Sequence, residues 1–136
     1  MAEDCIFCKI VAGELPSETV QEDEHTVAFM DINPWTRGHA LVIPRNHSRN
    51  IYDVESDDLR HTAIAAKRLA LRMREHLGCD GINVLHACEP AAWQTVFHFH
   101  MHVIPRYVDD PLEVPVRPQQ AEQEELARVA AELRGA

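Results

Sequence analysis

The sequence predicts an α+β protein built on one mostly antiparallel sheet. Three observations favour this class: short apolar runs separated by tight turns, one long amphipathic segment over residues 56–77, and a strict apolar–polar alternation over residues 94–104. Strands joined by short turns pair in an antiparallel fashion, and a helix with one apolar stripe can cover such a sheet.

Length and composition exclude several classes of protein. The 136 residues suit one domain over 1–136, and a content of 46% hydrophobic residues is typical of a folded chain. No apolar run reaches the roughly 18–20 residues of a membrane span, and the N-terminus lacks the pattern of a secretory signal. We therefore expect a cytoplasmic protein with reduced cysteines and no membrane partner.

The net charge of −9 also narrows the partners. Affinity for long nucleic acid comes mostly from neutralising phosphates, so an acidic chain argues against that partner. The charge does not exclude a small nucleotide held in one pocket.

The first half of the chain predicts a short helix followed by strands. Asp4 can cap a helix with an apolar face, and Gly13 can end it. We expect two strands at Thr19–Gln21 and Thr26–Phe29 around an acidic turn. A third apolar strand follows over residues 39–43.

The long helix over residues 56–77 is the clearest element of the second half. Apolar residues recur there at spacings of three and four. Ser56 or Asp57 can cap this helix, and Gly78 can end it. The remaining predicted elements are strands over residues 81–87 and 94–104 and a terminal helix over residues 122–133.

Three histidines alternate with apolar residues in the last predicted strand. On a strand, one face would carry Phe97, Phe99, Met101 and Val103 toward the long helix, and the other would carry His98, His100 and His102. Because residues two apart rise roughly 6.5–7 Å, one zinc ion cannot easily collect all three imidazoles. Two neighbours can share a metal, or the three can act as nucleophile, proton donor and metal ligand.

A C-x-x-C pair, Cys5 and Cys8, lies at the start of the first predicted helix. Redox, metal-binding and chance interpretations all fit such a pair. A tetrahedral zinc site needs two further ligands, for which His47 and His98 are candidates. Spacing alone does not favour them over His25, His39 or His86.

The segment His98–Ile104 resembles the signature of the histidine triad family of nucleotide hydrolases and transferases. The likeness extends to Cys5–Lys9, Phe29–Pro34, Gly38–Pro44, His47 and Gln94–Val96, and so spans about residues 4–106. It implies a five-stranded antiparallel sheet with helices on it, a homodimer with a shared sheet, and a C-terminal extension over 107–136. It also implies cleavage or transfer at the α-phosphorus of a nucleotide.

The resemblance implies a role for each matching residue. His100 would attack the phosphorus, His102 or nearby groups would protonate the leaving group, and His39 would line the site. The implied nucleotide-binding set is Asp31 for the ribose hydroxyls, Gln94 and Thr95 for phosphate, and Ile6, Phe7, Phe29 and Ile32 for the purine. An ordinary core role fits these last four residues equally well.

The resemblance also assigns the C-x-x-C pair. In zinc-carrying bacterial members, a cysteine pair and two histidines hold the metal, and the matching positions here are Cys5, Cys8, His47 and His98. We therefore expect a structural Zn²⁺ closed by four protein ligands, with the nucleophile left free.

The loop before the triad departs from the family pattern. Ala87 stands where an Asn or Gln usually touches phosphate, and Trp93 stands where Gly is usual. Glu89 would repel a polyphosphate, whereas Trp93 would narrow the site, stack on a base or fill the core. We expect Cys79 and Cys88 to be packing residues.

These observations favour a purine nucleoside phosphoramidase that binds a purine nucleotide or nucleoside phosphoramidate. A dinucleoside polyphosphate hydrolase is the close alternative. Two further hypotheses are a nucleotide-binding regulatory protein with little activity and a metallohydrolase whose zinc is bound by His98 and His100. The sequence assigns no function to His25, His61, His76 and His86.

Overall fold

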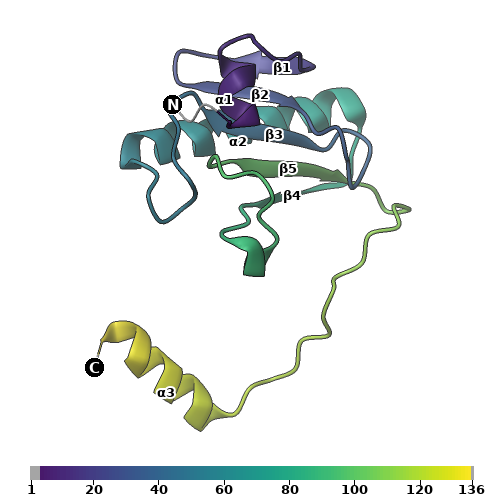
Figure 1. Ribbon diagram of the computed structural model, residues 1–136. Coiled ribbons are helices and arrows are strands. Elements are labelled where there is room, and N and C mark those ends of the chain that lie inside the picture. Colours follow the sequence, from purple (N-terminus) through teal and green to yellow (C-terminus); the bar gives the residue numbers. More distant parts are fainter. Residues whose placement is uncertain (1–3, 136) are drawn as a thin grey trace.

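The computed structural model describes residues 4–135. Residues 1–3 and 136 lie outside the described residues. The prediction that no secretory signal is present, and the predicted domain over 1–136, both include them. The described elements are α1 (Ile6–Val11), β1 (Thr19–Glu22), β2 (Thr26–Met30), β3 (Ala40–Pro44), α2 (Ser56–Leu77), β4 (Gly81–Leu85), a single 3₁₀ turn (Pro90–Ala92), β5 (Met101–Arg106) and α3 (Gln123–Arg134) (Figure 1). They confirm the predicted α+β class.

The five strands form one sheet in the order β1-β2-β3-β5-β4, and every neighbouring pair is antiparallel. β5 therefore lies between β3 and the edge strand β4. His102 on β5 is flanked by Leu41 on β3 and Leu85 on β4. Of the three alternating histidines, His102 therefore lies in the sheet, one strand in from its edge.

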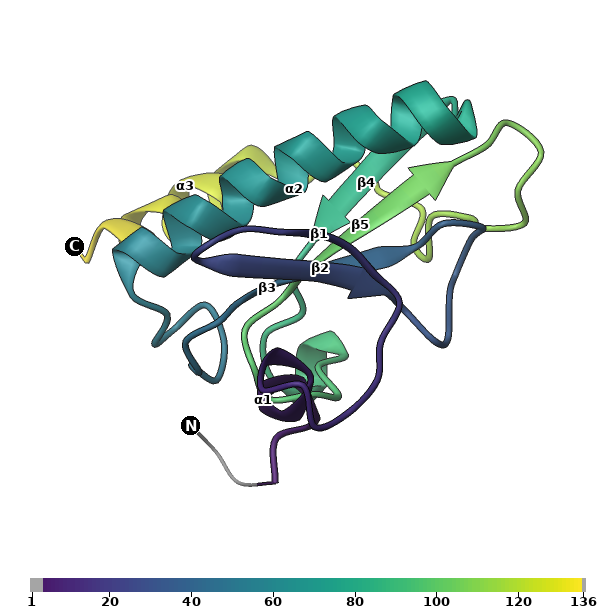
Figure 2. The same cartoon turned by 90° about the horizontal axis from the view of Figure 1, so that it is seen from above.

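The two faces of the sheet are covered by different helices, α2 on one side and α1 on the other (Figure 2). Alternate residues of β3 divide between the two layers. Ala40 and Val42 pack in the cluster that includes α2, whereas Leu41 and Ile43 pack in the cluster that includes α1. A strand buried on both faces needs apolar residues throughout, which explains the run in β3.

The bounds of α2 match the prediction, but its N-terminal cap does not. The N-cap residue is Glu55, and no side chain there bonds to the free backbone N–H groups, so neither Ser56 nor Asp57 acts as the cap. Two acidic residues of the first turn, Asp57 and Asp58, instead complement the positive end of the helix dipole. Gly78 ends the helix in the left-handed conformation, as predicted.

The cap of α1 is Cys5 rather than the predicted Asp4. The Cys5 Sγ accepts a hydrogen bond from the Cys8 backbone N–H at 3.3 Å. The cap therefore places the two sulfur atoms of the C-x-x-C pair on the same side of the first helical turn.

The predicted strand over 94–104 is wrong in its first half. β5 begins at Met101, and the seven residues before it are irregular. The Phe99 N–H donates to the Ser48 carbonyl at 2.8 Å, so this segment is held by the loop after β3 rather than by a strand ladder. The apolar–polar alternation of the sequence continues into this irregular segment. Its side chains lie partly in the interior, as His98 and Phe99 do, and partly at the surface, as Phe97 does.

The apolar face predicted for this strand is only partly formed. Met101 and Val103 pack toward α2, as predicted. Phe99 is fully buried outside that cluster, whereas Phe97 is 36% exposed and lies against the Arg49 guanidinium, whose carbon is 4.3 Å from the ring centroid.

Two prolines lie inside strands that they were expected to follow. β3 includes Pro44, and β5 continues through Pro105 to Arg106. Both still act as acceptors, because the Pro44 carbonyl receives a bond from His98 and the Pro105 carbonyl receives one from Thr36. β4 ends at Leu85, two residues before the predicted strand end.

The C-terminal extension leaves β5 as a long extended segment and ends in α3, set apart from the sheet (Figure 1). The predicted apolar face of this helix is exposed at Leu126, Val129 and Leu133. None of the helices within residues 4–135 is both long and apolar enough to cross a membrane.

Candidate functional site

The four predicted metal ligands lie close together at the first turn of α1. Cys5 and Cys8 come from the first turn of α1, His47 from the loop after β3, and His98 from the segment before β5. Their ligand atoms all lie within 4.8 Å of one another. Three of the four residues are buried, and His47 is exposed.

The spacing of these ligand atoms fits a tetrahedral cation. The His98 Nδ1 lies 3.5 Å from each sulfur, and the His47 Nδ1 lies 3.3 Å from the Cys8 Sγ and 3.3 Å from the His98 Nδ1. A zinc tetrahedron with its usual bond lengths has S–N edges of about 3.5 Å and N–N edges of about 3.3 Å. The donor set and its spacing therefore fit Zn²⁺.

Hydrogen bonding gives His98 the form that a metal ligand needs. Its Nε2–H donates to the Pro44 carbonyl at 2.8 Å, which leaves the Nδ1 lone pair directed at the two sulfurs. Burial lowers the His98 pKa to about 4, so the ring is neutral near pH 7. Burial also raises the pKa of the Cys5 thiol, and a bound cation would favour the thiolate there.

His100 is held as a neutral imidazole with one free nitrogen. Its Nδ1–H donates to the His98 carbonyl at 2.6 Å, which leaves the lone pair on Nε2. The residue is 3% exposed, and burial lowers its pKa. The edge of the Phe7 ring packs against the imidazole at a centroid distance of 5.1 Å. A neutral, oriented imidazole is suited to nucleophilic attack.

A chain of hydrogen bonds fixes the tautomer of His102. The Trp35 backbone N–H donates to the His39 Nδ1 at 3.0 Å, so the proton of neutral His39 lies on Nε2. That Nε2–H donates to the His102 Nδ1 at 2.9 Å. The proton of His102 therefore lies on its Nε2, where it can be given to another group. Burial lowers the His102 pKa to about 4. Burial also lowers the pKa of His39, although the negative charge of Asp31 acts in the opposite direction and raises it.

Asp31 lies beside this pair at the end of β2. Its Oδ2 is 3.5 Å from the His39 Nε2, and its Oδ1 accepts the Asn33 N–H at 2.8 Å. Ligand atoms of Asp31, His39 and His102 lie within 4.8 Å of one another, but the hydrogen bond between the two rings already uses their facing nitrogens.

The hypothesis of a zinc ion shared by His98 and His100 does not fit this arrangement. Neither of the two candidate metal clusters among the described residues includes His100. The Nδ1 that would face a shared ion is instead bonded to the His98 carbonyl.

A cavity of about 290 Å³ opens beside the triad. It is lined by Asp31, Asn33, Trp35, Leu85, Ala87, Trp93, Thr95, His100 and His102. Of the two residues predicted to contact phosphate, Thr95 lines this cavity and Gln94 does not. The Gln94 amide is buried and bonds to the backbone of Arg49, Val96 and Glu89. Gln94 therefore ties the loop together.

The four residues predicted for the purine are not brought together around this cavity. Phe7 and Phe29 are buried in the core, with ring centroids 5.3 Å apart. Ile6 lines a separate hollow beside His47, and Ile32 is 91% exposed. Phe7 and Phe29 thus pack in the core, and the assignment of these four residues to the purine stays a prediction.

The loop before the triad carries two residues in unusual backbone conformations. Glu89 has a φ of +71° and Trp93 a φ of +77°, values that favour glycine. A glycine at position 93 would adopt this φ without strain. Trp93 is 64% exposed and lines the triad cavity, so it is not core filler. Ala87 is buried at the cavity wall.

Glu89 does not present a free charge to the site, contrary to the expected repulsion. Arg49 binds its carboxylate through two nitrogens, each at 2.8 Å, and the Asn50 Nδ2 donates to it at 2.6 Å. These bonds lower the Glu89 pKa to about 2. The ion pair fastens the loop to the chain after β3 instead of opposing a phosphate.

The sequence interpretation missed two residues that organise the triad. The His86 Nε2 accepts the Ile51 N–H at 3.1 Å, and its Nδ1–H donates to the His100 carbonyl at 2.9 Å. Trp35 supplies the N–H that sets the His39 tautomer, and its indole stacks on His102 at 5.9 Å. A tryptophan in a polar loop beside Asn33-Pro34 was the available signal. Cys79 packs partly against the α2 core, as expected, and Cys88 is partly buried.

Comparison with known proteins identifies close relatives. The HIT domain family model matches residues 12–109. "Protein hit" of Bacillus subtilis is 46% identical over 106 residues, which are 78% of this chain and 73% of that protein.

Two solved structures share the fold. A Zn-bound histidine triad family protein from Mycobacterium smegmatis is 40% identical, with a TM-score of 0.78 over 97% of this chain and 96% of that one. A histidine triad nucleotide-binding protein from Candida albicans is 31% identical, with a TM-score of 0.85 over 97% of this chain and 96% of that one.

Proposed function

Since the chain belongs to the histidine triad (HIT) family, a class of nucleotide-binding hydrolases and transferases, we propose that it is a purine nucleoside phosphoramidase. In this proposal the enzyme cleaves the P–N bond at the α-phosphorus of an adenosine or guanosine phosphoramidate. The observation that carries the proposal is the pair of tautomers set by hydrogen bonds. His100 offers a lone pair on Nε2, and His102 offers a proton on Nε2.

The proposed reaction has two steps. The His100 Nε2 attacks the phosphorus, a new P–N bond forms, and the bond to the leaving amine breaks as the amine nitrogen takes the Nε2 proton of His102. His100 is then a nucleotidyl-imidazolium cation, and His102 is an imidazolate that accepts the His39 Nε2–H. Water then attacks the nucleotidyl-histidine, its proton passes to His102, and His100 is released. Both imidazoles start neutral because burial lowers the pKa of each.

The cavity supplies further parts of the proposed site. Thr95 and Asp31 both line this cavity. In this proposal the Thr95 hydroxyl donates to a phosphate oxygen, and Asp31 accepts the ribose hydroxyls. His39 holds His102 and is a positioning residue in this scheme. We propose Zn²⁺ at Cys5, Cys8, His47 and His98 as a structural ion, because all four positions for protein ligands are filled.

We also propose that the protein is a homodimer that continues the sheet through β4. This strand is at the edge of the sheet, and its Val84 is 52% exposed. An exposed apolar edge is a template for pairing with a second chain. The exposed apolar face of α3 offers such a partner additional surface. Light scattering after gel filtration would show a mass of two chains.

The proposal is tested with adenosine 5′-phosphoramidate and single variants. We expect His100→Ala to lose turnover at least a thousandfold, and His102→Ala to slow it about a hundredfold, within the usual range of proton-transfer catalysis. His76→Ala, on the exposed end of α2, is the matched control and should retain wild-type turnover. Thermal unfolding confirms that each variant folds. Turnover that persists in a folded His100→Ala variant would refute the mechanism.

The same assay separates the alternatives. Faster cleavage of a diadenosine polyphosphate than of the phosphoramidate would favour the dinucleoside polyphosphate hydrolase. Tight purine nucleotide binding without turnover of either compound would favour the regulatory protein.

A further inference from the structure

His86 lies directly after β4, where the pairing of β4 with β5 stops. β4 ends at Leu85 and β5 begins at Met101, so the carbonyl of His100 lies just outside the ladder. This carbonyl accepts a hydrogen bond from the His86 side chain at 2.9 Å. The His86 side chain thus continues the connection between the two strands beyond the ladder, up to the proposed nucleophile.

The partners of His86 fix the direction of both of its hydrogen bonds. A backbone N–H can only donate, and a carbonyl can only accept. The Ile51 N–H donates to the His86 Nε2 at 3.1 Å, so the ring proton lies on Nδ1, from which it is donated to the His100 carbonyl. His86 therefore makes both bonds only as a neutral imidazole in this one tautomer.

The Ile51 end of this connection lies in a turn that hydrogen bonds hold in shape. The Asp53 carboxylate accepts the backbone N–H groups of Arg49 and Asn50 at 3.1 and 2.9 Å. The Asp53 N–H in turn donates to the Asn50 carbonyl at 3.2 Å. Because Ile51 lies inside this turn, its N–H has a fixed direction, and the His86 ring is held by it.

The His86 ring also packs against the triad segment. Its centroid is 4.7 Å from that of the buried Phe99 ring and 6.3 Å from that of His100, to which it is nearly perpendicular. The His100 Nδ1–H donates to the His98 carbonyl, so the direction of the His100 ring follows the backbone of this segment. A group that holds the His100 peptide therefore also holds the His100 imidazole.

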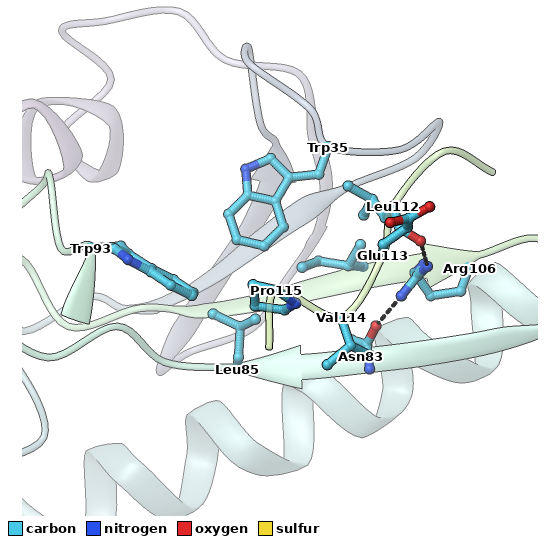
Figure 3. Close-up of a pocket in the computed structure, with 10 residues that line it drawn as sticks. Trp35, Asn83, Leu85, Trp93, Arg106, Leu112, Glu113, Val114 and Pro115 are labelled. Atoms are coloured by element: carbon cyan, nitrogen blue, oxygen red, sulfur yellow. Dashed lines mark hydrogen bonds between the residues drawn. The ribbon is translucent and has the colours of Figure 1, made fainter. Parts of the chain in front are cut away.

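His86 acts on the nucleophile from outside the substrate space. Its two neighbours in the sequence, Leu85 and Ala87, line the triad cavity, whereas the ring of His86 is turned to the partners described above. Figure 3 shows the Leu85 side chain in the same space as the indoles of Trp35 and Trp93. A substitution at position 86 should therefore leave the walls of the cavity in place.

We propose that His86 is a positioning residue, which holds the His100 peptide so that the His100 Nε2 is directed at the phosphorus. The inference rests on the proposed function, because it assigns an orienting group to the nucleophile of that reaction. A misplacement of about 1 Å at a reacting group can cost on the order of a hundredfold in rate. Loss of the bond to the His100 carbonyl should therefore lower kcat and leave KM nearly unchanged.

Two amide substitutions separate the two hydrogen bonds of His86. The side-chain amide of Asn occupies the position of the imidazole Nδ1, and that of Gln occupies the position of Nε2. His86→Asn can therefore keep the bond to the His100 carbonyl and lose the bond to Ile51, whereas His86→Gln does the reverse. With adenosine 5′-phosphoramidate, we expect kcat to fall about thirtyfold in His86→Gln and about threefold or less in His86→Asn, with KM within about twofold of the wild type in both.

A merely structural role would give a different result. Each variant loses one hydrogen bond of His86, so the two should have similar midpoints of chemical denaturation. Equal falls of kcat in the two variants would then refute the positioning role. A larger fall in His86→Asn would assign the effect to the Ile51 bond and overturn the proposal as well. The control His76→Gln, on the exposed end of α2, should retain the wild-type kcat.

The tautomers provide a test that does not depend on turnover. Long-range ¹H–¹⁵N spectra of the zinc-loaded protein show which nitrogen of each imidazole carries the proton. We expect Nδ1 for both His86 and His100, and we expect the His100 signals to move in His86→Gln and to stay in place in His86→Asn. A proton on the His86 Nε2, or His100 signals that ignore both substitutions, would refute the positioning role.

The two proposals fail in different ways. Absence of turnover in the wild type would refute the phosphoramidase, while the His100 signals would still decide whether His86 holds the His100 ring. Wild-type turnover together with equal kcat in His86→Asn and His86→Gln would refute the positioning role and leave the phosphoramidase intact.

Discussion

Replacing Gly38 by alanine should destabilise the protein through two separable effects. Gly38 precedes β3 and has a φ of +96°, a conformation that side-chain-bearing residues rarely adopt. A Cβ built there would lie 2.5 Å from the Leu77 Cδ1 and 3.0 Å from the Pro105 Cγ. The glycine thus permits the close approach of the end of α2, β5 and the loop that carries His39.

The magnitude follows from these two effects. The left-handed backbone costs an alanine about 1–2 kcal/mol. Overpacking against Leu77 and Pro105 costs about 1–3 kcal/mol, and the loss of chain entropy in the unfolded state offsets roughly 0.4–1 kcal/mol. We expect the free energy of unfolding to fall by about 3 kcal/mol, which lowers Tm by about 10 °C in a domain of this size.

Chemical denaturation of Gly38→Ala and Gly13→Ala measures the two effects separately. Gly13 has a φ of +77° and no neighbouring atom within 4 Å of a built Cβ, so its variant carries the backbone strain alone. We expect Gly13→Ala to lose about 1 kcal/mol. The double variant Leu77→Ala/Gly38→Ala should lose less free energy of unfolding than the sum of the losses in the two single variants. The reason is that Leu77→Ala removes the side-chain end that the new Cβ would meet.

The comparison has a clear negative result. Equal losses in Gly38→Ala and Gly13→Ala would show that the three elements do not approach each other as closely as the structure describes. Strict additivity in the double variant would show that Leu77 does not make the contact.

Two further predictions concern the metal ligands and the loop. His47→Ala should lower the zinc content, measured by elemental analysis, well below one ion per chain. Each tenfold loss of zinc affinity removes about 1.4 kcal/mol of stabilisation. Loss of zinc from His100→Ala instead would contradict the assignment. Glu89, with its pKa lowered from 4.5 to about 2, stabilises the fold fully above pH 4.5 and loses this effect as pH falls toward 2. Arg49→Gln should raise that pKa toward 4.5 in a carboxyl NMR titration, and an unchanged value would contradict the ion pair.

The sequence predicted the elements whose signals are local. The apolar stripe and Gly78 define α2 because spacing and backbone freedom act within a few residues. The four metal ligands were predicted as a set only through the family resemblance, because spacing left other histidines open. Their convergence depends on how α1, the loop after β3 and the segment before β5 meet in space.

The errors come from features that tertiary contacts decide. Alternation over residues 94–100 resembles a strand, but the Phe99 N–H bonds to the loop at Ser48, so no ladder forms there. The phosphate contact expected of Gln94 stays a prediction, and in the structure its amide is bonded within the loop. The tautomers of His100 and His102 depend on the carbonyl of His98 and the backbone N–H of Trp35, and no pattern of side chains reveals those partners.

His98 belongs to both of the candidate sites. Its imidazole faces the two sulfurs, and its carbonyl accepts a hydrogen bond from the Nδ1–H of His100. A rotation of its backbone therefore turns the imidazole of His100, the proposed nucleophile. Chelators, thiol oxidants or competing soft metals that alter the cysteine cluster would act on turnover without entering the substrate cavity. In the proposed scheme, the metal content of a preparation is thus part of the definition of its specific activity.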